Sequence, residues 1–153
     1  MSQYSKIMSA AEKQCARSGV RLTEKRKYIL SGLLKSNRAL SAYELIDYCK
    51  EAYDKPMPAT SVYRILELLQ EEDLVHKLNT ANKYVACSHI ACDHKHEIPQ
   101  FLICDNCQTV EEIGISKSTI SSIEKSANNV GFHLLSPQLE INSICFACSD
   151  SLP

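Results

Sequence analysis

The sequence predicts an α+β protein in which a winged helix-turn-helix domain is followed by a small α/β domain. Three observations lead to this prediction. Four helical segments precede any strand signal, two alternating runs then flank "NTAN", and beyond Cys87 a polar, His-rich link leads to short strands and one further helix. We place the domain boundary near residues 84–90, which gives domains of residues 1–86 and 87–153.

The first two helical segments each have an apolar stripe and a boundary residue. Gly19 is the predicted C-cap of the first, and Thr23 is the predicted N-cap of the second, "EKRKYILSGLLKS". The residues of the two stripes are Ile7, Ala10, Ala11 and Cys15 in the first, and Tyr28, Ile29, Leu30, Leu33 and Leu34 in the second.

The third and fourth segments have the pattern of a helix-turn-helix. Ser41 opens the third segment, and Glu44 completes a capping box. The prolines of "YDKPMPAT" interrupt the helix, and the fourth segment is predicted to begin with Thr60 or Ser61 as its N-cap. Together with the hairpin around "NTAN", these helices predict a winged helix whose fourth helix is presented to DNA.

The second half of the chain mixes strands with one helix. Strands are expected in "FLIC", "TVEEI" and "LEINSI". A helix is expected from about Ser116 to Val130, closed by Gly131.

Composition favours a globular protein of the cytoplasm. The chain has 153 residues, 44% of them hydrophobic, and no apolar run that suits a signal peptide or a membrane span. Because cytoplasmic thiols stay reduced, the eight cysteines are better explained as metal ligands and buried thiols than as four disulfides. Cys15, Cys49 and Cys92 are expected to be free thiols, the first two buried.

Charge is distributed unevenly along the chain. Residues 1–40 carry nine basic and two acidic side chains, a net charge of +7, and residues 84–153 carry three basic and eight acidic ones, a net charge of −5. This polarity suits a chain whose first part meets a polyanion, although a solvated basic face explains the charge alone equally well.

Two CxxC pairs, Cys104 with Cys107 and Cys145 with Cys148, predict one tetrahedral zinc site. The 37 residues between the pairs require the intervening helix to fold back so that the second pair meets the first. Four protein ligands leave no open position, so the zinc is expected to be structural. A thioredoxin-type site is less suitable, since no helix opens at the first pair.

A second set of donors surrounds the hairpin and the link. His76 and Cys87 flank the hairpin and can approach each other, which predicts a second site of nitrogen, sulfur and oxygen ligands bridging the two domains. Taken singly, each donor is better explained as an ordinary surface residue. The further candidates are His89, Cys92, His94, His96, Glu111, Glu112 and His133.

Four stretches of the chain resemble, in order, the ferric uptake regulator superfamily, and they are most similar to its zinc uptake regulator branch. The stretches are "RLTEKRKYIL", "TSVYRILELLQEEDLVHKL", "FLICDNCQTVEEI" and "ICFAC". The resemblance implies a winged helix joined to an α/β dimerisation domain, in a homodimeric, metal-responsive repressor.

The resemblance also implies ligand roles. The structural zinc falls on the two CxxC pairs, in agreement with their spacing. The regulatory zinc falls on His76, Cys87, Glu112 and a histidine of the link, for which we prefer His96 over His94 or His89. The thiolate of Cys87 favours zinc over iron or manganese, and a clear His and Asp set of the peroxide-sensing kind is missing from the sequence.

DNA contacts are expected from the fourth helix and the basic first part. Arg64 resembles the base-reading arginine of the family and can bind guanine through two hydrogen bonds. Ser61 and Tyr63 lie beside it, and packing is an equally good explanation of Tyr63. Tyr43 is expected to add a base or phosphate contact. The expected phosphate contacts are Lys13, Arg17, Arg21 and Arg26.

The sequence therefore predicts a zinc-dependent repressor of zinc-import genes that binds palindromic DNA as a homodimer, with no membrane partner and no small-molecule substrate. An iron- or peroxide-responsive regulator is the alternative within the superfamily. A zinc hydrolase or deaminase fails because "HEIPQ" lacks a second histidine and no H-x-E precedes the CxxC. A zinc-stabilised interaction module leaves the basic segment unexplained.

Overall fold

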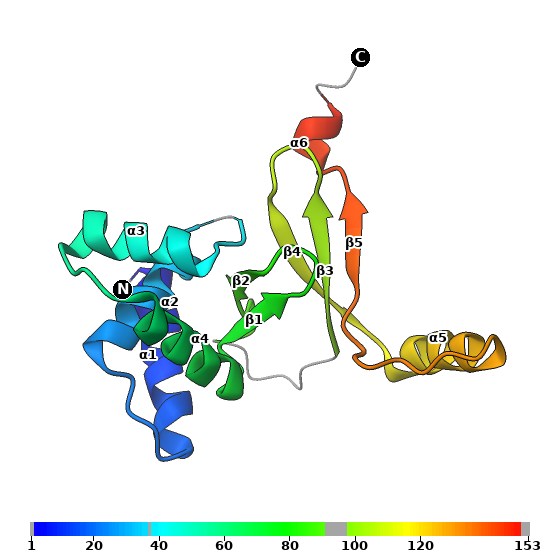
Figure 1. The fold of residues 1–153 in the computed structure, drawn as a ribbon, viewed down its shortest axis with the longest axis horizontal. Helices are drawn as coiled ribbons and strands as arrows, with labels where there is room; N and C mark the ends of the chain where they lie inside the picture. The colour runs from blue at the N-terminus through cyan, green and yellow to red at the C-terminus, as the bar shows by residue number, and fades with distance from the viewer. Residues whose placement is uncertain (1, 37, 91–97, 151–153) are drawn as a thin grey trace. The chain divides into compact units, whose positions relative to one another are not determined.

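The computed structural model describes residues 2–36, 38–90 and 98–150. The chain divides into two compact units, Met1–Cys92 and Asp93–Pro153 (Figure 1). The elements of the first unit are α1 (Gln3–Arg17), α2 (Glu24–Lys35), α3 (Ala42–Tyr53), α4 (Ala59–Glu71), β1 (Val75–Leu78) and β2 (Lys83–Ala86). The elements of the second are β3 (Ile98–Cys104), β4 (Val110–Ile115), α5 (Lys117–Asn129), β5 (Glu140–Ser143) and α6 (Phe146–Ser149).

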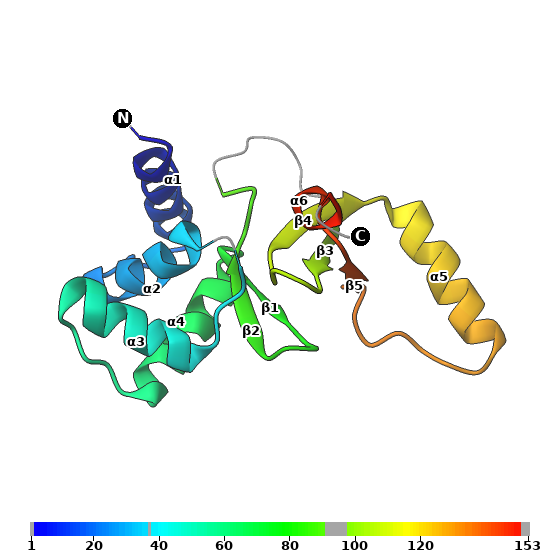
Figure 2. The same ribbon diagram turned by 90° about the horizontal axis from the view of Figure 1, so that it is seen from above.

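The helices of the first unit form as their apolar stripes predict. Helices α2, α3 and α4 pack against one another (Figure 2), and Cys15 and Cys49 are buried in the core as expected. At Gly32, an added Cβ would lie 2.9 Å from Cδ1 of the Tyr48 ring. A glycine therefore permits the close approach of α2 and α3.

One predicted helix start is wrong. Helix α4 begins at Ala59 with Pro58 in the N-cap position, rather than with Thr60 or Ser61 as the N-cap. Pro58 has φ of −67° and ψ of 151°, an extended conformation that proline adopts without strain. Thr23 occupies the N-cap of α2 as predicted, but its side chain makes no capping hydrogen bond.

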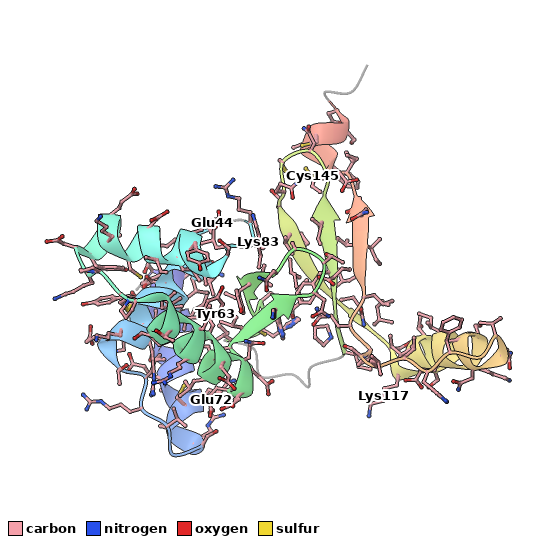
Figure 3. All side chains as sticks on the ribbon, viewed as in Figure 1. Glu44, Tyr63, Glu72, Lys83, Lys117 and Cys145 are labelled. Atoms are coloured by element: carbon pink, nitrogen blue, oxygen red, sulfur yellow. The ribbon has the colours of Figure 1, made fainter. Side chains whose placement is uncertain are left out.

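The wing is an antiparallel hairpin tied to the segment before α3. Strands β1 and β2 pair with Val75 opposite Ala86, and Leu40 forms a bridge to Tyr84 through two backbone hydrogen bonds of 2.9 and 2.8 Å. The predicted capping box of α3 is confirmed, because Ser41 and Glu44 exchange side-chain and backbone hydrogen bonds. Glu44 also forms an ion pair of 3.2 Å with Lys83 of β2 (Figure 3).

The ion pair at Glu44 makes stability depend on pH. Burial alone would raise the pKa of Glu44, but the hydrogen bond from the Ser41 backbone and the Lys83 ammonium outweigh it and lower the pKa below its ordinary value. A lowered folded-state pKa contributes stability above the unfolded-state value, and this contribution is lost as pH falls through the folded-state value. We expect Glu44→Gln to cost about 0.5 kcal/mol at neutral pH, a cost that decreases in acid as Glu44 becomes protonated. Urea unfolding of both proteins at pH 7 and pH 3 measures this difference, and an equal cost at both pH values would contradict the prediction.

The second unit is a three-stranded sheet with a helix at each end. The strand order is β4-β3-β5, with β3 antiparallel to β4 and parallel to β5. The buried Gln100 of β3 donates to the carbonyl of Pro137 at 2.7 Å and accepts from the Leu139 backbone N–H, which holds the approach to β5 against β3. None of the helices in the described part of the chain combines the length and apolar character needed to cross a bilayer.

Candidate metal centre and nucleic-acid interface

The strand directions bring the two CxxC pairs together. Strand β5 runs parallel to β3 with Ser143 opposite Cys104, so the chain leaves β5 at the same end of the sheet as the β3–β4 turn. A hydrogen bond of 2.9 Å from the Asp105 backbone N–H to the Ser143 carbonyl ties the two segments together. Figure 3 places Cys145 at this end of the sheet, next to α6. The fold therefore brings the two CxxC pairs to the same end of the sheet, although 37 residues separate them in sequence.

The four sulfurs form one cluster. The Sγ atoms of Cys104, Cys107, Cys145 and Cys148 all lie within 4.8 Å of one another, and those of Cys107 and Cys145 are 3.8 Å apart. Zn–S bonds of about 2.3 Å in a tetrahedron require sulfurs about 3.8 Å apart. The donor set and its spacing therefore fit a tetrahedral zinc ion.

Hydrogen bonds make the four thiols unequal. Backbone N–H groups of Cys107 and then Cys145 lower the pKa of Cys104 to about 6, and Thr109 lowers the pKa of Cys107. At Cys148 the Asn106 amide acts in the lowering direction, but the Cys145 sulfur, burial, and the sulfurs of Cys107 and Cys104 outweigh it and raise the pKa to about 11. Negative charge on the first thiolates thus opposes ionisation of the last, so the full set of thiolates needs a cation.

Two of the predicted regulatory ligands meet in the first unit. His76 lies on β1, Cys87 follows β2, and their ligand atoms lie within 4.8 Å of each other. The backbone N–H of Cys87 donates to the Leu74 carbonyl at 2.9 Å, which extends the hairpin pairing to the ligand. Cys87 is buried, and His76 is half-buried. The hairpin therefore supplies one nitrogen and one sulfur donor side by side.

The remaining candidates occupy different places. His89 is half-buried, and its backbone N–H donates to the Cys87 Sγ at 3.4 Å. Glu112 and the exposed Glu111 belong to β4 of the second unit, and His133 is exposed after α5. Cys92, His94 and His96 lie outside the described residues.

The predicted DNA-reading side chains lie near the starts of α3 and α4. Tyr43 in the first turn of α3 is 65% exposed, and Tyr63 in α4 is 40% exposed. Arg64 is exposed and Ser61 is half-buried. The opposite face of α4 buries Val62, Leu66 and Leu69 in the core. Helix α4 is therefore held by one face and offers Tyr63 and Arg64 on another.

The predicted phosphate contacts lie on and after α1. Lys13, Arg17 and Arg21 are exposed, and Arg26 is half-buried. The Arg26 guanidinium donates to the Arg21 carbonyl at 2.6 Å, so it braces the segment between α1 and α2. Sequence patterns contain no signal for this bond, because it depends on how α2 meets the preceding loop.

Comparison with known proteins agrees with this architecture. The ferric uptake regulator family model matches residues 17–142, which is most of the chain. The chain belongs to the ferric uptake regulator family. Membership supports the prediction of a transcription regulator rather than an enzyme.

Within the family, the chain is similar to both zinc uptake and ferric uptake regulators. The zinc uptake regulation protein of Escherichia coli is 36% identical over 142 residues, covering 93% of this chain and 81% of that protein. The ferric uptake regulation protein of Synechococcus elongatus is 32% identical over 143 residues, covering 88% and 89%. A solved structure of a zinc uptake regulator complexed with zinc and DNA matches with a TM-score of 0.81 at 31% identity, covering 98% of this chain and 97% of that one.

Proposed function

We propose that this protein is a zinc-responsive transcriptional repressor that binds palindromic operators of zinc-uptake genes as a homodimer. The observation that carries the proposal is the match, across both units, to a zinc uptake regulator complexed with zinc and DNA. We place the protein in the cytoplasm, where thiols stay reduced; no disulfide joins the seven described cysteines.

In this proposal, Cys104, Cys107, Cys145 and Cys148 hold a structural zinc. Bound zinc would neutralise the thiolates and cross-link the β3–β4 turn to α6. Cys104 is buried at the end of β3, Cys145 is the N-cap of the short α6, and Cys148 lies within α6. The four side chains therefore hold the C-terminal segment to the sheet when they share an ion.

The regulatory site is proposed to consist of His76, Cys87, Glu112 and His96, with His94 or His89 as alternatives to His96. Support comes from the adjacent donors of His76 and Cys87, since a mixed nitrogen, sulfur and oxygen set suits Zn²⁺. Ligands drawn from both units would restrict how the units are oriented when zinc is sufficient. Loss of zinc would remove that restriction and lower DNA affinity, with a coupling of about 1–3 kcal/mol.

The first unit would carry out DNA recognition. Arg64, with Ser61 and Tyr63 beside it, is proposed to contact bases, and Tyr43 to contact a base or phosphate from α3. Phosphate contacts are assigned to the basic residues of the first 40 positions, which fix register without reading sequence. These contacts are Lys13, Arg17, Arg21 and Arg26.

Homodimer formation is supported by the apolar surface of the second unit. Strand β5 forms an edge of the described sheet, and several large apolar side chains near it or after α5 are exposed. These are Val130, Phe132, Leu134, Leu135, Ile141, Ile144 and Phe146. A second copy that covers these residues would remove apolar surface from water, and a two-fold dimer matches a palindromic operator.

Metal counting combined with DNA binding tests the proposal. A palindromic duplex is first selected from a random-sequence pool with the zinc-loaded parent protein, and gel shifts then compare excess zinc with chelator. We expect zinc to tighten binding of the parent about 5- to 150-fold. Cys87→Ser and His76→Ala are each expected to bind one ion fewer per chain, to keep their fold, and to lose the zinc response.

The exposed His133 provides the matched control, since His133→Ala should keep both ions and the response. Unfolding of the Cys87 and His76 variants, or zinc binding equal to the parent, would refute the assigned ligand roles. DNA binding by the parent that is equally tight with and without zinc would refute the function itself. Gel shifts with Fe²⁺ in place of Zn²⁺ test the iron-responsive alternative, which predicts that Fe²⁺ tightens DNA binding more than Zn²⁺ does.

A further inference from the structure

Asn106 connects the two CxxC pairs without being a ligand. It lies between Cys104 and Cys107 in the β3–β4 turn, and its side-chain Nδ2 donates a hydrogen bond of 3.2 Å to the Cys148 Sγ. The two residues are 42 positions apart in sequence. The Asn106 amide, within the first CxxC pair, therefore holds the Cys148 sulfur of the second CxxC pair.

Cys148 is carried by a short helical turn. It lies on α6, a single turn of four residues with no buried residue, and Phe146 of the same turn is 87% exposed. The backbone hydrogen bonds of this turn, from Cys148 and Ser149 to the Cys145 carbonyl, stay within it. Within one copy of the chain, the turn is therefore held more by hydrogen bonds than by burial in the core.

Cys104 and Cys107 are held differently. Cys104 is buried at the end of β3, and the Cys145 backbone N–H donates to its Sγ at 3.4 Å. The Cys107 Sγ lies 3.0 Å from the Thr109 hydroxyl in its own turn. The first of these bonds reaches only Cys145, at the start of α6, and the second stays within the β3–β4 turn. The Asn106 amide reaches Cys148, which lies further along α6.

We propose that Asn106 is a positioning residue that retains Cys148 on the zinc ion and so controls how slowly the structural zinc is released. The inference rests on the proposed zinc occupancy of the four cysteines. A hydrogen bond to a metal-bound thiolate withdraws negative charge from sulfur and fixes its orientation. With that bond in place, the Cys148 sulfur should dissociate from the ion more slowly. It should also react more slowly with electrophiles.

The test measures zinc release from the full-length, zinc-loaded protein to a chromogenic chelator in excess. Asn106→Leu removes the donor at similar volume, and Asn106→Asp replaces it with a carboxylate of the same shape. We expect release about 10-fold faster for Asn106→Leu, in line with the loss of one hydrogen bond to a ligand, and faster still for Asn106→Asp. Because Asn106 is exposed, both variants should fold.

A second readout locates the effect. The zinc-loaded proteins are treated with limiting iodoacetamide, and peptide mapping identifies the cysteine alkylated first. Cys148 is expected to gain reactivity in both Asn106 variants, whereas a general loss of stability would expose the four cysteines alike. Gln108→Met is the matched control, since the Gln108 amide in the same turn donates to the Asp105 carbonyl at 3.0 Å and not to sulfur.

The outcomes separate this inference from the proposed function. Release from Asn106→Leu at the parent rate, equal acceleration in Gln108→Met, or uniform alkylation of the four cysteines would overturn the role of Asn106. A parent protein that holds no zinc on these cysteines would instead overturn the zinc site on which the inference rests.

Discussion

Replacing Cys107 with serine is expected to abolish retention of the structural zinc and to unfold the second unit. Within one copy of the chain, the described part of this unit buries only Gln100, Phe101, Cys104 and Ile120, a core too small to hold a fold without a further cross-link. Structural zinc contributes an apparent binding free energy of about 10–16 kcal/mol at neutral pH, which far exceeds what so few buried side chains supply. Three remaining thiolates cannot complete a closed tetrahedral site.

The measurement is zinc content after dialysis against a moderate chelator, together with amide NMR spectra. The parent should retain one ion per chain, and Cys107→Ser should retain none and lose dispersed signals from the second unit. Cys15→Ser, the same change at a buried thiol of α1, should keep the zinc. A folded second unit that still held its ion in Cys107→Ser would show that the metal is bound elsewhere.

Replacing Arg64 with alanine is expected to reduce affinity for the selected palindrome about 30-fold or more. A bidentate arginine–guanine contact contributes about 1–3 kcal/mol of base discrimination. A homodimer carries two copies of Arg64, one for each half-site. The substitution therefore removes the binding free energy of two contacts on one operator. Arg64 is exposed on α4, while Val62 and Leu66 hold the helix in the core, so the fold should be unaffected.

Arg64→Lys separates base reading from charge. Lysine keeps the positive charge but lacks the planar fork, so this variant should bind nonspecific DNA like the parent and still lose preference for the palindrome. Arg17→Ala should instead weaken binding to all sequences and reduce the salt dependence by about one phosphate contact per chain. Equal losses on specific and nonspecific DNA for Arg64→Ala would assign Arg64 to the phosphate backbone.

Much of the fold follows from local pattern. The capping box of Ser41 and Glu44, the hairpin around residues 79–82, and the helix that ends before Gly131 all form where the sequence predicts them. These features depend on residues only a few positions apart, because capping, turn conformation and apolar periodicity act within one or two turns. The start of α4 differs from the prediction, because Thr60 and Ser61 are favourable N-cap residues but Pro58 occupies that position.

The candidate sites were predicted in part. Cysteine spacing predicted the cluster of Cys104, Cys107, Cys145 and Cys148 that the structure shows, since a CxxC pair is a local pattern with few uses in a reduced chain. The predicted hairpin brought His76 and Cys87 together, and family resemblance then selected them with Glu112 from a longer set of donors. No pattern identified Asn106, Gln100 or the brace from Arg26 to Arg21, because an amide or guanidinium acquires its role only from the partner that folding brings to it.

The sequence by itself determined the order of helices and strands, the two cysteine pairs and the basic character of the first 40 residues. Each of these features depends only on residues that are close together in sequence. Tertiary structure alone decided that the parallel pairing of β3 with β5 brings Cys145 and Cys148 to the end of the sheet that carries Cys104 and Cys107. It also decided that the Asn106 amide meets the sulfur of Cys148. The physical reason is that strand direction and register set contacts between residues about 40 positions apart, and local propensity contains no information about them.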